Sequence, residues 1–346
     1  MNVLLTCAGR RNYLVQYFQE ALSGRGEVYS ADASPDAPAM EEADRAFLVP
    51  PVDAPGYFDA VLALCRKHRV RLLISLNDLE LSLLARQRER FLQVGTWPVV
   101  SSPEVIDTCW DKWKTTRFLS SCGIGSPKTY LSLLEARRAL RSGELHFPLV
   151  IKPRWGTASI GIFYPENEEE LEFAYRYSKA NIQRTILAAA SKAGGNRSIL
   201  IQERLQGQEH GIDVINDLEG GYVCTFVKRK LAMRSGETDR AVTVQHPELE
   251  SLGRKIGERL GHVANLDCDV FLLEDGCRVL ELNSRFGGGY PFSHAAGANI
   301  PAALIAWAER REPDPSWLTV QPQVIAAKCD RLVLRRSKVD ESFCGY

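Results

Sequence analysis

The sequence of 346 residues lacks any apolar run of about 18 residues, the length that a membrane-spanning helix needs. Its opening stretch, MNVLLTCAGRR, also lacks the basic start and the apolar segment of roughly 7 to 15 residues that mark a signal peptide. Internal repeats and low-complexity tracts are absent too, and 45% apolar with 25% charged residues is the composition of an ordinary globular protein. We therefore expect a cytoplasmic protein that is neither exported nor membrane-bound.

An excess of charge of either sign is also missing, because 43 basic residues balance 43 acidic ones. This balance favours neither nucleic acid nor an anionic membrane as a partner, and we expect neither. The nine cysteines include no pair at C-x-x-C spacing, and an odd number fits poorly with a disulfide framework. We therefore expect reduced thiols.

Strand and helix patterns alternate through the first hundred residues, which predicts an α/β lobe with a parallel sheet. Apolar strand-like runs lie at 2–9, 26–34 and 70–78, and stretches with helical spacing lie at 11–22 and 57–68. A serine before Pro103 is a good helix start and marks a domain boundary near residue 100.

The pattern of predicted strands and helices changes after this boundary. From about residue 146 onward short strands predominate, interrupted by one predicted helical segment at 168–193, which is an α+β pattern. A last helix is expected at 301–311, and the tail has strand character with no recognisable chemistry.

The turn after the first strand, TCAGRRNYL, contains a single glycine. A dinucleotide-binding turn is disfavoured, because the bulky Tyr13 and Leu14 stand where such turns need small residues. A purely structural turn remains open. So does a third reading, in which Arg10 and Arg11 hold a substrate carboxylate or phosphate at a helix N-terminus.

Polar residues also follow a later strand of the same lobe, in ISLNDLE. Asn77 and Asp78 lie at the carboxyl edge where open α/β sheets bind ligands. Helix capping would explain the same residues, so both interpretations stay open.

The stretch VIKPRWGTASIG follows a predicted buried strand that carries Lys152. Backbone N–H groups of a loop with Gly156, Thr157, Ser159 and Gly161 can approach phosphate oxygens, and the lysine adds a point charge. An ordinary hairpin with a partly exposed lysine is the alternative.

Two further charged stretches are ambiguous by themselves. QERLQGQEHGIDV offers Glu203 and Glu209 around a turn, and VKRKLAMRSG offers Lys228, Lys230 and Arg234. Either set could be a solvated edge, or the basic residues could face an anion.

The stretch LELNSRFGGGY carries an acid, an amide and an arginine at alternate positions. On a strand, Glu281, Asn283 and Arg285 would share one face, while Leu280 and Leu282 would point the other way. Carboxylate and amide oxygens are ligands that Mg²⁺ prefers, and a neighbouring strand brings Asp267 or Asp269 alongside. The alternative for this stretch alone is a half-exposed strand.

Taken together and in order, DKWKT, VIKPRWGTASIG, QERLQGQEHGIDV and LELNSRFGGGY resemble the ATP-grasp superfamily, over roughly residues 1–312. The resemblance is to carboxylate–amine ligases akin to the carbamoyl phosphate synthase large subunit. It implies a Rossmann-like pre-ATP-grasp α/β lobe at 1–100 and an α+β ATP-grasp fold at 101–320. The lid subdomain would lie at about 125–202, and a C-terminal tail at 321–346.

The resemblance also implies a role for each matching residue. Lys112 and Lys152 would contact ATP phosphates under the loop Gly156 to Gly161, with Glu203, Arg204 and Leu205 beside adenine and Glu209 on the ribose. Asp269, Glu281 and Asn283 would bind one or two Mg²⁺ ions, with Mn²⁺ as an alternative. Arg285, with Lys152, would be catalytic. Substrate contacts would come from Arg10, Arg11, Asn77, Asp78, Lys228, Arg234 and Gly288.

The implied reaction joins a small-molecule carboxylate to an amine. The carboxylate would attack the γ-phosphate to give an acyl phosphate and ADP, and the amine would then form an amide. A homodimer is common among similar enzymes. The alternatives are a kinase, a carbamoyl-phosphate-type activator, and a nucleotide-binding module without turnover.

Overall fold

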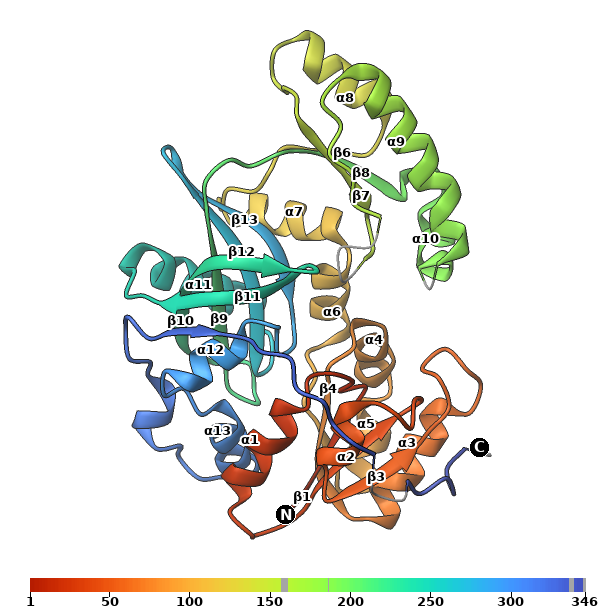
Figure 1. Cartoon of the computed structure of the whole chain (residues 1–346), viewed down its shortest axis with the longest axis vertical. Coiled ribbons are helices and arrows are strands. Elements are labelled where there is room, and N and C mark those ends of the chain that lie inside the picture. Colours follow the sequence, from red (N-terminus) through yellow and green to blue (C-terminus); the bar gives the residue numbers. More distant parts are fainter. Residues whose placement is uncertain (157–160, 186, 336–338, 345–346) are drawn as a thin grey trace.

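A computed structural model describes residues 1–156, 161–185, 187–335 and 339–344, and these residues form three sheets. Figure 1 shows the first sheet low in the molecule, the second at the top and the third between them. The predicted order of a parallel α/β lobe followed by antiparallel sheets is confirmed.

The first sheet is parallel, with strand order β3-β2-β1-β4-β5. Its strands are β1 Asn2–Thr6, β2 Val28–Asp32, β3 Arg45–Leu48, β4 Val70–Ser75 and β5 Trp97–Pro98. The connecting helices are α1 Tyr13–Leu22, α2 Pro38–Glu42, α3 Tyr57–Lys67, α4 Asp78–Arg86 and α5 Arg88–Gln93. Nearly every residue of β1 and β4 is buried, as expected for parallel strands that are covered on both faces.

The two faces of this sheet pack against different parts of the chain. Leu4 points into a core with α3, α4 and α5, whereas Val3 and Leu5 pack with α1 and with Leu304 of a helix far away in the sequence. That helix is α13, Ile300–Ala308, which lies against α1 (Figure 1). The core that contains Val3 and Leu5 is thus shared by the N-terminal lobe and the C-terminal part of the chain.

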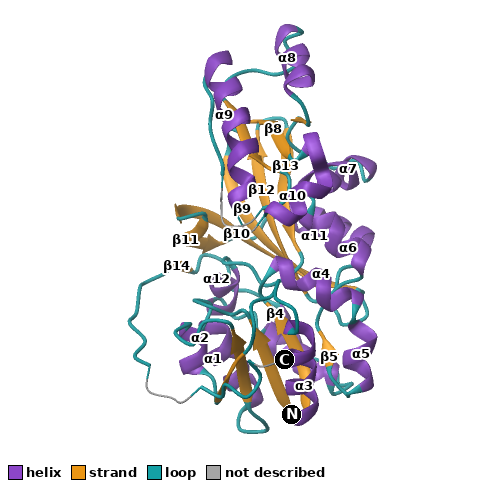
Figure 2. Cartoon of the chain, turned by 90° about the vertical axis from the view of Figure 1, so that its right-hand side faces the viewer, coloured by secondary structure: helices purple, strands orange, loops and turns teal. Residues whose placement is uncertain are grey.

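The small second sheet has the order β6-β8-β7 and is covered by helices on one side (Figure 2). It contains β6 Thr129–Tyr130, β7 Leu149–Pro153 and β8 Ile199–Glu203, with α8 Leu133–Arg141 and α9 Glu168–Asn181 packed on it. Two helices, α6 Pro103–Trp110 and α7 Lys112–Ser121, connect this part to the first sheet.

The third sheet has six strands in the order β13-β12-β9-β10-β11-β14. The strands are β9 Gln208–Asn216, β10 Tyr222–Arg234, β11 Glu237–Thr243, β12 Asn265–Leu273, β13 Gly276–Asn283 and β14 Ile325–Ala327. Helix α11 Pro247–Leu260 buries Leu249 and Ile256 against the strands, and α12 Tyr290–Ala295 precedes α13.

The prediction of one helix over 168–193 was wrong. Helix α9 ends at Asn181, a 3₁₀ turn covers Ile182–Arg184, and α10 Ala188–Gly194 is separate. Thr185 explains the break, because its hydroxyl donates to the carbonyl of Ile182 and accepts from the N–H of Leu187. Such local side-chain bonds compete with a continuous helix.

The predicted tail contributes to two of the sheets. Its strand β14 pairs with β11, and Phe343 is buried beside Phe47 of β3, with ring centroids 5.7 Å apart. Asp340 bonds to the backbone of Leu48 and Ala46. The chain therefore returns from the third sheet to the first (Figure 2).

We expect Phe343→Ala to lower the free energy of unfolding by about 3 kcal/mol, because it leaves a cavity in the first lobe. Leu332→Ala is the control in the same segment, since Leu332 is 93% exposed, and it should change stability little. Urea unfolding followed by circular dichroism measures both. Equal effects would show that the tail does not hold the lobe together.

Candidate active site

A cavity of about 580 Å³ lies between the second sheet, the third sheet and the turn after β1. Most of the residues singled out from the sequence line it: Arg11, Lys112, Lys152, Gly156, Glu203, Arg204, Leu205, Glu209, Asp269, Glu281, Asn283, Arg285 and Gly288. They come from separate stretches of the chain, and the fold brings them together.

Two lysines from different elements, α7 and β7, line the cavity. Lys112 is the first residue of α7, and its Nζ donates to the carbonyl of Gly156 at 2.7 Å and to Oε1 of Glu281 at 3.1 Å. Lys152 is buried on β7, and burial lowers its pKa to about 8, although Glu281 opposes this shift. Both cations therefore lie near the same carboxylate.

Sequence reasoning missed the ion pair that fixes Lys112. Asp111 caps α7 by accepting from the N–H groups of Trp113 and Lys114. Its carboxylate also accepts two bonds from Arg154, from Nε at 2.7 Å and from Nη2 at 2.6 Å. The bulky Arg154 before the glycine loop thus anchors the helix that carries Lys112.

Residues 157–160 lie outside the described residues, so the predicted contacts of Thr157 and Ser159 lie there as well. At the far end of this loop, Gly161 has φ +72°, a left-handed conformation that favours glycine, but it does not line the cavity.

The carboxylates face one another across β12 and β13. Asp269 pairs in register with Glu281, and Asp267 with Asn283. Both aspartates line the cavity, so the sequence ambiguity between Asp267 and Asp269 corresponds to two neighbouring positions on one face. Burial, followed by the charges of Asp269 and Asp213, raises the pKa of Asp267.

A register shift in this pair of strands corrects the predicted alternation. Asp269 is opposite Glu281, but the next residue, Val270, is opposite Val279, so Leu280 is the extra residue of a β-bulge. Val279 and Leu282 are buried in the core, whereas Leu280 lines the cavity beside Glu281. The expectation that Leu280 points away from the cavity was wrong.

The sequence alone did not decide whether Lys230, on β10, is solvated or faces the site; in the structure it lines the cavity. Its Nζ donates to Asp269 Oδ1 at 2.6 Å and to Glu209 Oε1 at 2.7 Å. Burial would lower its pKa, but these two carboxylates raise it above its usual value, so Lys230 stays charged. Burial meanwhile raises the pKa of Glu209.

A metal at this end of the cavity would find two carboxylates and one amide oxygen, on Asp269, Glu281 and Asn283. Within the described ranges, no cluster of three or more His, Cys, Asp or Glu side chains could hold a metal ion. Mg²⁺ is commonly bound by one or two carboxylates together with substrate phosphates and water. This partial oxygen set therefore fits Mg²⁺ delivered with a nucleotide.

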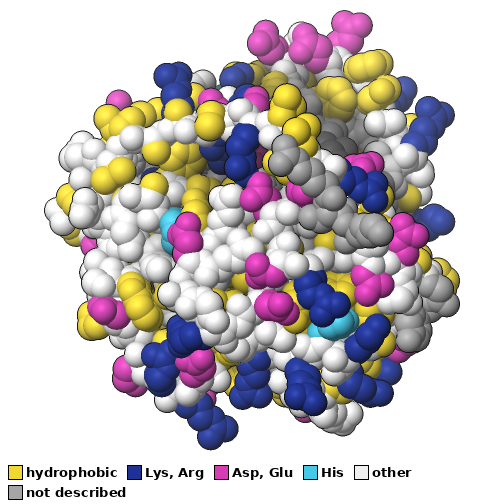
Figure 3. Space-filling model, turned by 60° about the horizontal axis from the view of Figure 1, so that its bottom comes forward, with side chains coloured by type: hydrophobic (Ala, Val, Ile, Leu, Met, Phe, Trp, Pro, Cys, Tyr) yellow, Lys and Arg dark blue, Asp and Glu magenta, His cyan; other side chains and the backbone are white. Residues whose placement is uncertain are grey.

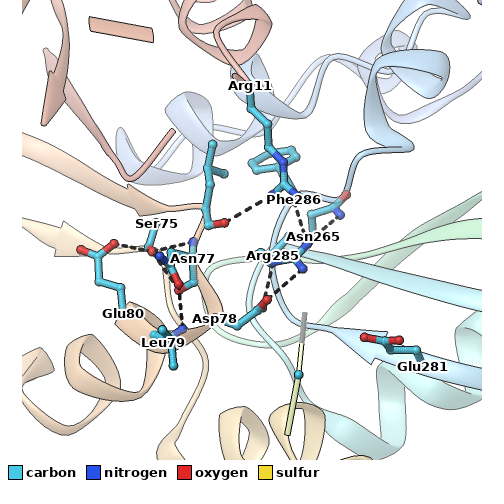
Figure 4. A network of polar contacts seen from close by, with 12 residues as sticks. Arg11, Ser75, Asn77, Asp78, Leu79, Glu80, Asn265, Glu281, Arg285 and Phe286 are labelled. Carbon is cyan, nitrogen blue, oxygen red and sulfur yellow. Dashed lines mark hydrogen bonds and ion pairs between the residues drawn. The ribbon is translucent and has the colours of Figure 1, made fainter. Parts of the chain in front are cut away.

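Arg285 reaches the cavity from a turn, because β13 ends at Asn283. Its Nε and Nη2 donate to the two carboxylate oxygens of Asp78 at 2.8 and 3.0 Å (Figure 4). Burial would raise the pKa of Asp78, but the guanidinium outweighs it and the pKa lies below its usual value. This buried pair joins α4 of the first lobe to the end of β13.

The glycine run after Arg285 is explained largely by packing. A Cβ at Gly287 would lie 2.0 Å from the carboxyl carbon of Asp267, and one at Gly289 would lie 2.7 Å from Cε of Lys228. Gly288 and Gly289 line the cavity. The run thus lets the backbone lie directly on charged side chains.

Five of the seven predicted substrate residues do not line the cavity, and three of these five have other partners near the surface or at a helix end. The Arg10 side chain is 85% exposed and pairs with Asp330 at 3.4 Å. Arg234 also pairs with Asp330. Asn77 caps α4 by accepting from the N–H of Leu79 at 3.0 Å, so the capping interpretation accounts for its side chain.

Lys228 and Asp78 lie just behind the cavity lining. Lys228 is fully buried, and its Nζ donates to Asp213 at 2.5 Å and to Ser293 at 3.2 Å. Its side chain packs against the glycine run at Gly289. Asp78 is joined to the site by its ion pair with Arg285.

Basic and acidic side chains both occur across the face viewed in Figure 3, with several acidic ones at the upper right and more basic ones along the lower edge. None of the helices in the described residues is long and apolar enough to cross a membrane.

A parallel α/β lobe followed by two antiparallel sheets, with a lysine- and carboxylate-lined cavity between them, defines the class of ATP-grasp proteins. Residues 3–100 match the family described as "PylC-like, N-terminal domain" and residues 196–329 match "ATP-grasp in the biosynthetic pathway with Ter operon". The chain belongs to the ATP-grasp superfamily and has a PylC-like N-terminal domain. Proteins of this superfamily bind ATP with Mg²⁺.

Curated relatives are distant. The carbamoyl phosphate synthase large chain of Rubrobacter xylanophilus is 25% identical over 237 residues, which are 64% of this chain and 20% of that one. The multifunctional protein CAD of Squalus acanthias is 21% identical over 265 residues, 73% of this chain and 11% of that one. The chain thus spans a fifth or less of the length of these relatives.

Solved structures share the fold. The L-amino acid ligase of Bacillus licheniformis has a TM-score of 0.68 at 18% identity, covering 93% of this chain and 78% of that one. The biotin carboxylase domain of Hydrogenobacter thermophilus 2-oxoglutarate carboxylase has a TM-score of 0.69 at 17% identity, covering 90% and 70%. The latter is a dimer in complex with MgADP and bicarbonate.

The buried pair predicts a specific coupling. Asp78→Asn should lower the free energy of unfolding by about 3 kcal/mol, because it leaves the Arg285 charge buried without its counter-ion. The double variant Asp78→Asn with Arg285→Gln should cost less than the sum of the two single changes. Urea unfolding of all four proteins measures this coupling, and strictly additive effects would contradict it.

Proposed function

We propose that the chain is an ATP-dependent carboxylate–amine ligase that forms an amide or peptide-like bond through an acyl phosphate. The observation that carries the proposal is the convergence of Lys112, Lys152, Asp269, Glu281 and Arg285 in one cavity that also has an open end. The shared fold with an L-amino acid ligase supports it. The substrates are small molecules, and the dimer of a similar protein makes a homodimer the assembly to test.

In this proposal the nucleotide lies between the second and third sheets. Lys112 and Lys152 bind its phosphates under the loop from Gly156 to Gly161, and residues 203–205 flank the adenine. Glu209 binds the ribose hydroxyls. The support is that residues of both sheets line the same cavity.

Asp269, Glu281 and Asn283 would hold Mg²⁺ or Mn²⁺, which supplies charge neutralisation for the phosphates. Lys112 and Lys230 balance Glu281 and Asp269 in the described residues. When phosphates bind, these lysines have new anionic partners. The carboxylates of Glu281 and Asp269 are then available to the metal ion. Each charged group thus keeps a partner of opposite sign.

The reaction then proceeds in two displacements. A carboxylate oxygen attacks the γ-phosphorus, the bond to the β-phosphate oxygen breaks, and ADP leaves with the electron pair. The amine nitrogen next attacks the acyl carbon, the C–O bond to phosphate breaks, and the nitrogen loses its proton to solvent. Arg285 is placed to stabilise the charge that develops on the transferred group.

Three alternatives would use the same nucleotide site. A kinase would need a hydroxyl acceptor, and a carbamoyl-phosphate-type activator would stop at the acyl phosphate; a binding module without turnover would release no ADP. Arg11, which lines the same cavity, favours a second substrate that carries a negative charge. We also propose the division into domains at 1–100 and 101–320, with a lid at about 125–202 and a tail at 321–346.

The reaction class is tested by trapping with hydroxylamine. With ATP, Mg²⁺ and a suitable acid from a broad panel, we expect ADP release and a hydroxamate, because the acyl phosphate is an electrophile. Arg285→Ala should suppress hydroxamate formation more than it weakens ATP binding, whereas Arg10→Ala is the control outside the cavity. A stable phosphate ester without hydroxamate would indicate a kinase instead.

The pKa of Lys152 predicts how ATP binding depends on pH. Its pKa of about 8 in the free protein means that the ammonium is charged below this pH and neutral above it. ATP affinity should therefore fall as pH rises above about 8, by up to about tenfold per pH unit. Lys152→Arg stays charged and should give a flat profile between pH 7 and about 9. Isothermal titration measures both, and parallel profiles would remove Lys152 from the phosphate site.

A further inference from the structure

Opposite charges from two lobes meet in the lining of the cavity. Arg11, in the turn after β1, donates from Nη2 to Oε1 of Glu237, the first residue of β11, at 3.3 Å. Both residues line the cavity. Sequence reasoning did not single out Glu237, because it is one of many acids that follow a turn.

Two backbone carbonyl groups fix the position of the Arg11 guanidinium. Its Nη1 donates to the carbonyls of Leu76 and Phe286, each at 3.3 Å (Figure 4). Arg285 also donates to the carbonyl of Phe286, at 3.3 Å. The two guanidinium groups therefore meet at one carbonyl, which places Arg11 directly beside the arginine assigned to the transferred phosphoryl group.

Glu237 is held in the same way. Its Oε2 accepts from Lys328 of the tail at 3.1 Å, and its carboxyl carbon would lie 3.0 Å from a Cβ at Gly288. Burial would raise its pKa, but Lys328 and Arg11 lower it below the usual value, so it is an anion at neutral pH. A carboxylate is thus fixed against the glycine run, next to the guanidinium of Arg11.

The distance between the Arg11 and Glu237 side chains is similar to the distance between the amino and carboxylate groups of an α-amino acid. In an α-amino acid, the bond lengths from the nitrogen through Cα to the carboxylate place nitrogen and oxygen about 3 Å apart. The Arg11–Glu237 separation of 3.3 Å is similar, so an amino acid can lie alongside the pair with each charge opposite its complement.

We propose that Arg11 and Glu237 recognise an α-amino acid as the amine substrate, Arg11 through the α-carboxylate and Glu237 through the α-amino group. This inference rests on the proposed ligase function and specifies the class of its second substrate. A simple alkylamine lacks the group that Arg11 binds, and an N-acylated amino acid lacks the group that Glu237 binds. Both are therefore poor ligands.

The test is calorimetric binding to the full chain with Mg²⁺ and a non-hydrolysable ATP analogue. The twenty common α-amino acids are screened first, and the tightest is compared with its methyl ester and its N-acetyl derivative. Each derivative should bind at least tenfold more weakly, because one charge-assisted contact is lost. This comparison uses the unaltered protein, so it needs no variant to fold.

Variants then assign each contact to its residue. Arg11→Gln should abolish the preference over the methyl ester and keep the preference over the N-acetyl derivative, and Glu237→Gln should do the reverse. Arg10→Gln is the matched control, since its exposed side chain does not line the cavity, and it should keep both preferences. Equal binding of amino acid and ester to the unaltered protein, or preferences that survive both variants, would overturn the inference.

The hydroxylamine assay separates this inference from the ligase proposal. Hydroxamate formation without binding of any amino acid would overturn the recognition site and leave the ligase function standing. Selective amino-acid binding without ADP release for any acid would support the recognition site and contradict the ligase function.

Discussion

The site depends on a buried ion pair between two lobes that are distant in sequence. Asp78 lies in the first turn of α4 and Arg285 just after β13, and their two bonds of 2.8 and 3.0 Å are almost shielded from solvent. A buried charge without its partner is costly, so each residue requires the other. The pair thereby fixes the end of β13, with Glu281 and Asn283, against the lobe that carries Arg11.

Three carboxylates of the cavity behind this pair each have a lysine partner. Glu281 has Lys112, and Asp269 and Glu209 share Lys230. Such matching limits the desolvation cost of a polar cavity within the core. Under the proposed function, the phosphates would become partners of the lysines and a metal ion would become a partner of the carboxylates, so each charged group keeps a partner of opposite sign.

Much of this arrangement could be predicted from the sequence, because it depends on local pattern. Alternating apolar runs predicted the parallel lobe, and the ordered motifs indicated most of the residues that line the cavity. The bulge at Leu280 could not be predicted, since one extra residue in a strand leaves no local signal. Lys230 and Glu237 were unresolved for a related reason: only the pairing of distant strands decides which charges of a basic or acidic stretch face inward.

The turn between β1 and α1 determines which of the neighbours Arg10 and Arg11 faces the cavity, a question that the sequence leaves open. Gly9 has φ +51°, and the N–H of Arg11 bonds to the carbonyl of Ala8, so the chain turns tightly between β1 and α1. Successive side chains of a tight turn diverge: Arg10 points to solvent and the tail, and Arg11 points to the carbonyl of Phe286. Because α13 packs on α1 in the shared core, this turn is held against the third sheet. The apolar interface between the lobes thus positions Arg11 in the lining of the cavity.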